Sequence, residues 1–153
     1  MYNDRPEMAF NRRVAVLAIG IGAGGFVLSL AGQNGETFKG RLSAMPADAR
    51  TRPNLAGSGS VTAVLSGTKL AITGSFEELL SAATSASLHS SVAAGVRGPG
   101  IGELTISKAT SGTLSGSVEL TPAQLNNLRK GGLYIQIDSE KAPDGVLWGW
   151  FLR

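Results

Sequence analysis

Apolar and polar residues alternate in short runs along most of the chain after Glu36. The alternation is clearest in Gly102–Lys108 and Thr113–Leu120, where nearly every second side chain is apolar. This period of two predicts β-strands with one buried face, and the Gly, Ser and Thr between the runs are typical of an antiparallel β-sandwich. The other predicted strands are Phe38–Met45, Ser60–Leu65, Lys69–Phe76, Thr84–Val92, Leu133–Asp138 and Val146–Leu152.

The connections between these runs carry turn and loop signals. Ser66-Gly67-Thr68 separates two runs and predicts a tight hairpin. Pro46–Ser58 has two prolines and no period, and Ala93–Gly102 is rich in Gly and Pro, so both are expected to be surface loops.

One short helix is expected within this all-β pattern. Thr121 can cap it, Pro122 suits its first position, and Gln124 can complete a capping box. Gly131 can end it after about three turns.

The last strand breaks the alternation. Leu133, Ile135 and Ile137 alternate with Tyr134, Gln136 and Asp138, which predicts a solvent-facing side for the preceding strand. After Pro143-Asp144-Gly145, however, Val146, Trp148 and Trp150 point one way, while Leu147 and Phe151 point the other. A strand that is apolar on both faces needs a cover on its second face, from loops or from a partner.

The N-terminal segment predicts export. Arg12 and Arg13 precede Val14–Ala31, an uncharged and mostly apolar run. Cleavage after Ala31 would make it a signal peptide, and a twin-arginine signal is a further reading. The run also approaches the roughly 20 residues that cross a bilayer, with the arginines on the cytoplasmic side.

Small residues in this run favour a retained anchor. Gly20 and Gly24 form a GxxxG pair, and Ala18 and Gly22 repeat its spacing, which lets two membrane helices approach closely. We expect residues 1–33 to be a cytoplasmic tip and single-pass inner-membrane anchor, and residues 34–153 to be one periplasmic domain. Cleavage would instead leave a secreted or periplasmic protein.

Composition narrows the function classes. A net charge of +3 in 153 residues, with the basic residues scattered, leaves no stripe that could follow a nucleic-acid backbone. The absence of cysteine excludes disulfides and thiol chemistry.

The order of several motifs resembles the CHRD domain, a family named after chordin and common in exported bacterial proteins. The resemblance extends from Phe38 to Leu152. It implies an immunoglobulin-like or Greek-key sandwich with a binding role and no known enzymatic activity. The segments that carry it are GSFEELLSAATSASLH, LTPAQLNNLRKGGLYIQID and PDGVLWGWF.

The chain departs from the family pattern at several polar positions. Family members often have His-x-His where this chain has Ser87-Leu88-His89, and Asn and His where it has Gln136 and Asp138. They often have Glu and Arg in place of Val146 and Trp148. The resemblance therefore implies that Val146, Trp148 and Trp150 form an apolar face that points away from the core.

Candidate chemistry is sparse. His89 is the single histidine and could act as a base or metal ligand. Asp138, Glu140 and Asp144 surround the last turn and could contact calcium, but their spacing fits no known loop. No Gly-x-Ser-x-Gly elbow or phosphate loop is present, so we expect neither an enzyme nor a cofactor.

Two functions follow from these patterns. The first is an accessory subunit of a membrane-associated assembly, with the bilayer around residues 14–31 and other subunits contacting Val146, Trp148 and Trp150. The alternative is a soluble periplasmic domain that binds a small ligand or metal ion.

Overall fold

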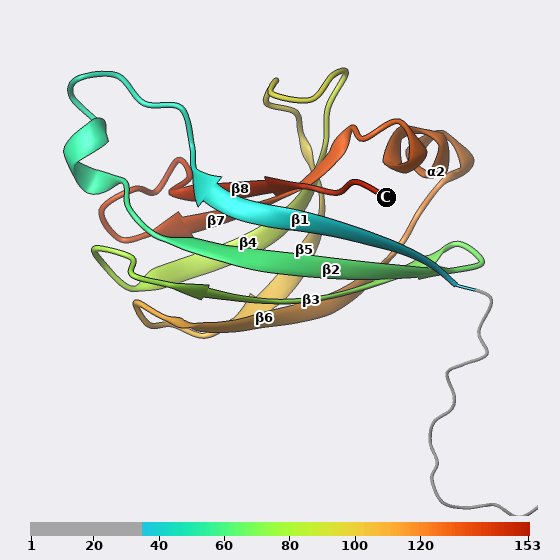
Figure 1. The fold of residues 1–153 in the computed structure, drawn as a ribbon, viewed down its shortest axis with the longest axis horizontal. Helices are drawn as coiled ribbons and strands as arrows, with labels where there is room; N and C mark the ends of the chain where they lie inside the picture. The colour runs from blue at the N-terminus through green and yellow to red at the C-terminus, as the bar shows by residue number, and fades with distance from the viewer. Residues whose placement is uncertain (1–34) are drawn as a thin grey trace, which may run out of the picture. The chain divides into compact units, whose positions relative to one another are not determined.

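The computed structural model describes residues 35–153 and shows a closed, eight-stranded antiparallel barrel (Figure 1). Its strands follow the order β1-β2-β3-β6-β5-β4-β7-β8 around the barrel. The barrel unit extends from Glu36 to Arg153. The strands are β1 (Glu36–Ala44), β2 (Ser58–Ser66), β3 (Lys69–Glu77), β4 (Ala83–Ser90), β5 (Gly100–Ile106), β6 (Gly112–Glu119), β7 (Leu133–Ser139) and β8 (Leu147–Trp150).

The predicted sandwich is wrong, because two strands change partners along their length. β1 pairs with β2 over residues 36–42 and with β8 at residues 43–44. β5 pairs with β4 over residues 100–104 and with β6 at residues 105–106. Each of these strands joins one sheet to the other, so the sheets close into a barrel and keep no free edge.

The seam between β1 and β8 requires a close backbone approach. A Cβ at Gly40 would lie 2.6 Å from the carbonyl oxygen of Trp150. Beyond this point, Lys39 and Leu152 exchange backbone hydrogen bonds of 2.8 and 2.9 Å. A side chain at residue 40 would therefore push the seam apart.

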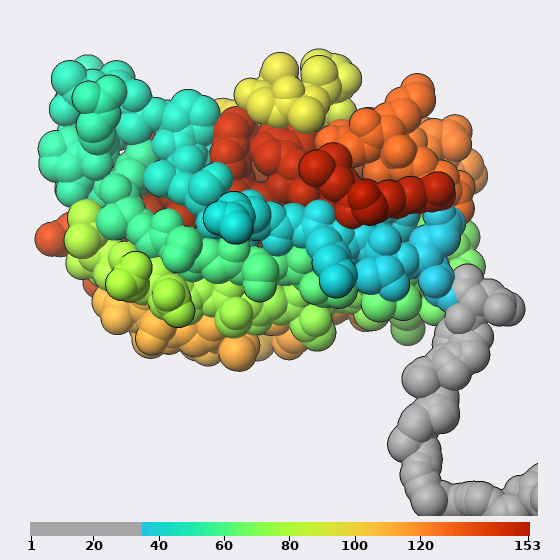
Figure 2. Space-filling view, viewed as in Figure 1, coloured from blue at the N-terminus to red at the C-terminus, as the bar shows by residue number. Residues whose placement is uncertain are grey.

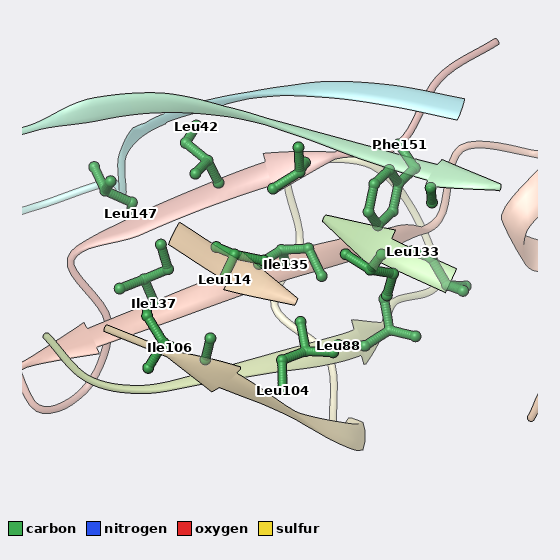
Figure 3. Close-up of a cluster of buried hydrophobic side chains, with 14 of the residues drawn as sticks. Leu42, Leu88, Leu104, Ile106, Leu114, Leu133, Ile135, Ile137, Leu147 and Phe151 are labelled. Atoms are coloured by element: carbon green, nitrogen blue, oxygen red, sulfur yellow. The ribbon is translucent and has the colours of Figure 1, made fainter. Parts of the chain in front are cut away.

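The alternating apolar residues fill the barrel (Figure 3). Leu42, Leu88, Leu114, Ile135 and Ile137 point inward from four different strands and are at most 2 % exposed. Each such side chain contributes about 1.5–3 kcal/mol to folding when it leaves water. The strands and the inward sides of β5, β6 and β7 were thus correctly predicted, even though the closure was not.

The predicted helix is confirmed as α2 (Pro122–Arg129). The Thr121 side chain accepts a hydrogen bond from the Gln124 backbone, and the Gln124 side chain accepts one from the Thr121 backbone. Leu128 is 1 % exposed and joins the barrel core, so the helix packs onto the barrel by this side chain.

The predicted hairpin and loops are also present. β2 and β3 pair up to Ser66 and Lys69 around Gly67, which has φ +63°. The loop after β1 contains one short 3-10 helix, η3 (Arg52–Asn54). The loop between β4 and β5, residues 91–99, rises from the barrel beside α2 (Figure 1).

The N-terminal predictions lie outside the described residues. These concern the anchor or signal at residues 14–31, with its packing residues Ala18, Gly20, Gly22 and Gly24. Among residues 35–153, no helix combines the length and the hydrophobicity that a membrane crossing needs.

Candidate binding face

The two apolar faces of β8 have different environments. Leu147 and Phe151 point into the barrel and are fully buried (Figure 3). Trp148 and Trp150 belong to a separate cluster on the outer side of the barrel wall. Val146, which the resemblance places on the tryptophan side, is instead fully buried among the residues of the barrel core. It therefore presents no surface to a partner.

Four residues outside the barrel form what we call the aromatic cluster: Met45, Tyr134, Trp148 and Trp150. Tyr134 pairs with Trp150 across β7 and β8, with ring centroids 4.4 Å apart. The edge of Trp148 meets Tyr134 at 5.6 Å and Trp150 at 5.3 Å. These tilted and edge-on arrangements are favourable for aromatic rings, so the cluster is packed as a second, smaller core.

The predicted solvent-facing side of β7 is therefore wrong. Tyr134 is 0 % and Gln136 is 8 % exposed, because the tryptophans and the nearby loops cover them. Only Asp138, of the three polar residues on this side, remains partly open to solvent.

His89 extends the aromatic cluster onto β4. It pairs with Tyr134 across the strands, and the two rings stack at 5.0 Å with an angle of 22°. Its Nδ1 lies 2.8 Å from the carbonyl oxygen of Gly98. Because a carbonyl oxygen only accepts, Nδ1 donates the proton. In the neutral ring, Nε2 then accepts from the Ser87 hydroxyl, also at 2.8 Å.

Gly98 anchors loop 91–99 above this cluster. Its N–H donates to the Tyr134 hydroxyl at 2.9 Å, and its carbonyl accepts from His89. A Cβ at this position would lie 2.0 Å from the carbonyl oxygen of Ser90, so the loop conformation requires glycine. Next to it, Arg97 Nη1 donates to the carbonyl oxygen of Asp144 at 2.9 Å, which ties the loop to the β7–β8 turn.

The anchored loop presents apolar side chains to solvent. Val92 is 93 % exposed and Val96 is 46 % exposed. In the space-filling view the loop stands out from the surface above the C-terminal strands (Figure 2). The tip of the loop thus offers two apolar side chains that the barrel does not bury.

The four acidic and histidine candidates do not gather into one site. Asp138 accepts hydrogen bonds from Ser85 and from Gln136, each at 2.8 Å. Glu140 and Asp144 are exposed near the β7–β8 turn, while His89 is hydrogen-bonded to the loop. Over residues 35–153, no group of three His, Cys, Asp or Glu side chains is placed to hold a metal ion.

Ser87 and His89 have the hydrogen bond of a nucleophile and its base, with the Gly98 carbonyl as the group that orients the ring. Acyl transfer also needs donors aimed at the developing oxyanion. The nearest cross-strand amide, that of Gln136, donates instead to Asp138. The hydrogen bond from His89 Nδ1 to the Gly98 carbonyl oxygen holds loop 91–99 to β4.

The sequence patterns missed two residues that organise this face. Tyr134 sits at a position where alternation predicts solvent, and Gly98 is one of several glycines in a loop. The apolar second face of β8 was the sequence feature that could have led to them, because Trp148 and Trp150 need other residues to cover them. Tyr134 and Met45 supply part of this cover, and loop 91–99 is hydrogen-bonded to the Tyr134 hydroxyl.

Comparison with known proteins identifies the family. Residues 24–149 match the model of the CHRD domain, which is most of the chain, and the protein therefore belongs to the CHRD domain family. No curated protein and no solved structure matches it.

Proposed function

We propose that this CHRD-domain protein is a non-catalytic accessory subunit of a larger membrane-associated assembly. In this proposal, residues 14–31 anchor it in the inner membrane and the barrel lies in the periplasm. The barrel contacts other subunits through the tip of loop 91–99 and the adjoining edge of the aromatic cluster. One observation carries the proposal: Val92 and Val96 are exposed on a loop that is fixed to the barrel.

The energetics favour such a contact. Burying an exposed valine against a partner contributes up to about 1.5–3 kcal/mol. The hydrogen bonds of Gly98 and Arg97 hold the loop before binding, so little ordering entropy is lost on association. Trp150 adds partly exposed aromatic area of the kind that is enriched at binding hot spots.

A membrane anchor would strengthen this contact further. If residues 14–31 dock against other membrane helices, the barrel is held near the same assembly and its second contact becomes effectively intramolecular. Neither contact then needs to be strong alone. Val146 is not part of the proposed surface, because it is buried in the barrel.

The test is the size of the native complex in mild detergent at native expression. The wild-type chain is expected to comigrate with larger partners, and the double variant Val92→Asp/Val96→Asp to migrate as a monomer. Val64→Asp is the matched control, since Val64 is an exposed valine on β2. Monomeric migration of the wild type contradicts the assembly, and comigration of the double variant contradicts the role of the loop.

The alternative function, a soluble periplasmic domain that binds a small ligand, has separate support. A cleft of about 520 Å³ opens between loop 91–99 and α2. It is not lined by His89, Asp138, Glu140 or Asp144, the residues from which the sequence suggested a metal or ligand site. N-terminal sequencing of the mature protein separates the two functions, because a start at Gly32 removes the anchor.

A further inference from the structure

The cleft between loop 91–99 and α2 has the dimensions of a small-molecule site. Its volume of about 520 Å³ lies within the roughly 300–1,000 Å³ of ligand pockets. Figure 2 shows the loop and the helix standing side by side above the C-terminal strands. The residues of the aromatic cluster do not line it, and Val92 is the one residue that it shares with the two valines of the proposed partner surface.

The base of the cleft is rigid. Asn127 on α2 donates from Nδ2 to Ser90 Oγ at 2.7 Å and to the Ser91 carbonyl oxygen at 2.8 Å. A Cβ at Gly132 would lie 2.1 Å from Asn127 Oδ1, which shows how tightly this carboxamide is enclosed. The Ser90 hydroxyl accepts from Asn127 and keeps its own proton for a further acceptor.

Two of the polar groups around the cleft are cationic, and none is anionic. Arg97 and Lys130 line it, and no Asp or Glu does. Neither cation forms an ion pair with any residue in 35–153. The Gln124 side-chain oxygen is used in the helix cap, which leaves its NH₂ group as a donor. A lining of this polarity matches an anion.

The walls of the cleft are apolar. Val92 and Pro99 from the loop and Ala123 from the helix contribute this surface. A ligand that matches both the cationic groups and the apolar walls has one negative charge near Lys130. Its compact apolar body lies between the loop and the helix. An inorganic anion would leave the apolar walls exposed to water. A cation with an apolar body would be repelled by the positive charges of Arg97 and Lys130.

We infer that this cleft binds a small organic carboxylate with a compact apolar body. The carboxylate lies at Lys130, within reach of Arg97 and of the amide donors of α2, and the body packs on Val92, Pro99 and Ala123. The inference does not depend on the partner surface, because the two share only Val92, the charged groups Arg97 and Lys130 decide the ligand, and a different measurement tests it.

Saturation-transfer NMR of benzoate on the full chain in detergent tests the inference, with protein-free micelles as the blank. Benzylammonium has the same ring and the opposite charge, so it is expected to give no signal. Lys130→Glu is expected to weaken benzoate binding about ten-fold, as the loss of a charged hydrogen bond would. Lys108→Glu, the same change at an exposed lysine outside the cleft, is expected to leave binding unchanged.

A second pair of variants tests the place of binding. Ala123→Phe fills the cleft from an exposed helix position and should abolish the benzoate signal, whereas Ala71→Phe on the exposed face of β3 should not. Circular dichroism verifies that each variant is folded. Equal binding of benzoate and benzylammonium overturns the inference, as does benzoate binding that survives both Lys130→Glu and Ala123→Phe.

Discussion

The two sides of β8 are both apolar, but they are buried by different means. On the inner side, Leu147 and Phe151 are enclosed by the other strands of the barrel and are fully buried. On the outer side, Trp148 and Trp150 are covered by one tyrosine, one methionine and the nearby loops, and Trp150 remains partly exposed. The inner side belongs to the fold, whereas the outer side depends on a few local contacts.

This difference indicates where the molecule can change without unfolding. The barrel core is held by ladders between eight strands, so losing one contact leaves many others. On the outer side, loop 91–99 is held largely at Gly98, where Tyr134 makes two hydrogen bonds and His89 makes one. Regions with few such contacts open locally at a low cost in free energy.

The largest expected effect on stability compares one substitution on the inner side of β8 with one on its outer side. Phe151→Ala should lower the free energy of unfolding by about 3–5 kcal/mol, because it leaves a cavity in a closed core. Trp150→Ala removes a larger side chain but should cost less, about 1–3 kcal/mol, because that ring is partly in solvent already. Urea unfolding of the two variants measures the difference. A larger loss for Trp150→Ala would contradict this comparison.

The next effect tests the anchor of the loop. A methyl group at Gly98 would lie 2.0 Å from the Ser90 carbonyl oxygen, so Gly98→Ala should cost about 2–3 kcal/mol and displace the loop. Gly95→Ala is the control in the same loop. Its Cβ would meet no atom within 4 Å, so only the φ of +85° opposes it, at about 1 kcal/mol. If both variants lose the same free energy of unfolding, the close approach of residue 98 to the Ser90 carbonyl oxygen does not matter for stability.

A smaller effect tests the two hydrogen bonds between the Tyr134 hydroxyl and Gly98. Tyr134→Phe keeps the stacked ring but removes the hydroxyl that accepts from the Gly98 N–H at 2.9 Å. The free energy of unfolding should fall by about 1–2 kcal/mol, because the covered Gly98 N–H is left without an acceptor. Amide exchange at Gly98 should accelerate while exchange in β2 and β3 stays unchanged. Equal acceleration throughout the barrel would mean that the loop and the barrel open together.

The sequence was sufficient for the strands but not for their closure. Apolar runs and the turn residues between them located all eight strands within a few residues, and alternation was clear in those with one side in the core and one in solvent. It could not show that β1 and β5 each pair with two neighbours, since this depends on twist and on close approach at positions such as Gly40. A sandwich and a barrel have the same period of two.

The binding face was foreseen only in part. The apolar second side of β8 indicated that something must cover Trp148 and Trp150. Part of the cover is Tyr134, which is hydrogen-bonded to loop 91–99, and the two are far from each other along the chain. Their meeting depends on the pairing of β4 with β7, which one-dimensional patterns do not contain.

The smallest expected effect on stability concerns an ion pair on the surface near the seam between β1 and β8. Glu36, at the start of β1, pairs with Arg129 of α2 at 2.6 Å and with Arg153. Chiefly through the hydrogen bond from Arg129, these partners lower the pKa of Glu36 below its ordinary 4.5. The stabilisation is therefore present above the ordinary pKa and is lost as the pH falls through the lowered one.

Glu36→Gln should thus lower the urea midpoint slightly at neutral pH, and its difference from the wild type should shrink as the pH falls below about 4. Glu103→Gln is the control, because Glu103 is exposed and has no ion pair within the barrel unit. Because Arg129 and Arg153 are both on the surface, added salt should screen their attraction to Glu36 and reduce the effect of Glu36→Gln. A difference that stays constant with pH and salt would mean that the glutamate acts at the seam by packing and not by its charge.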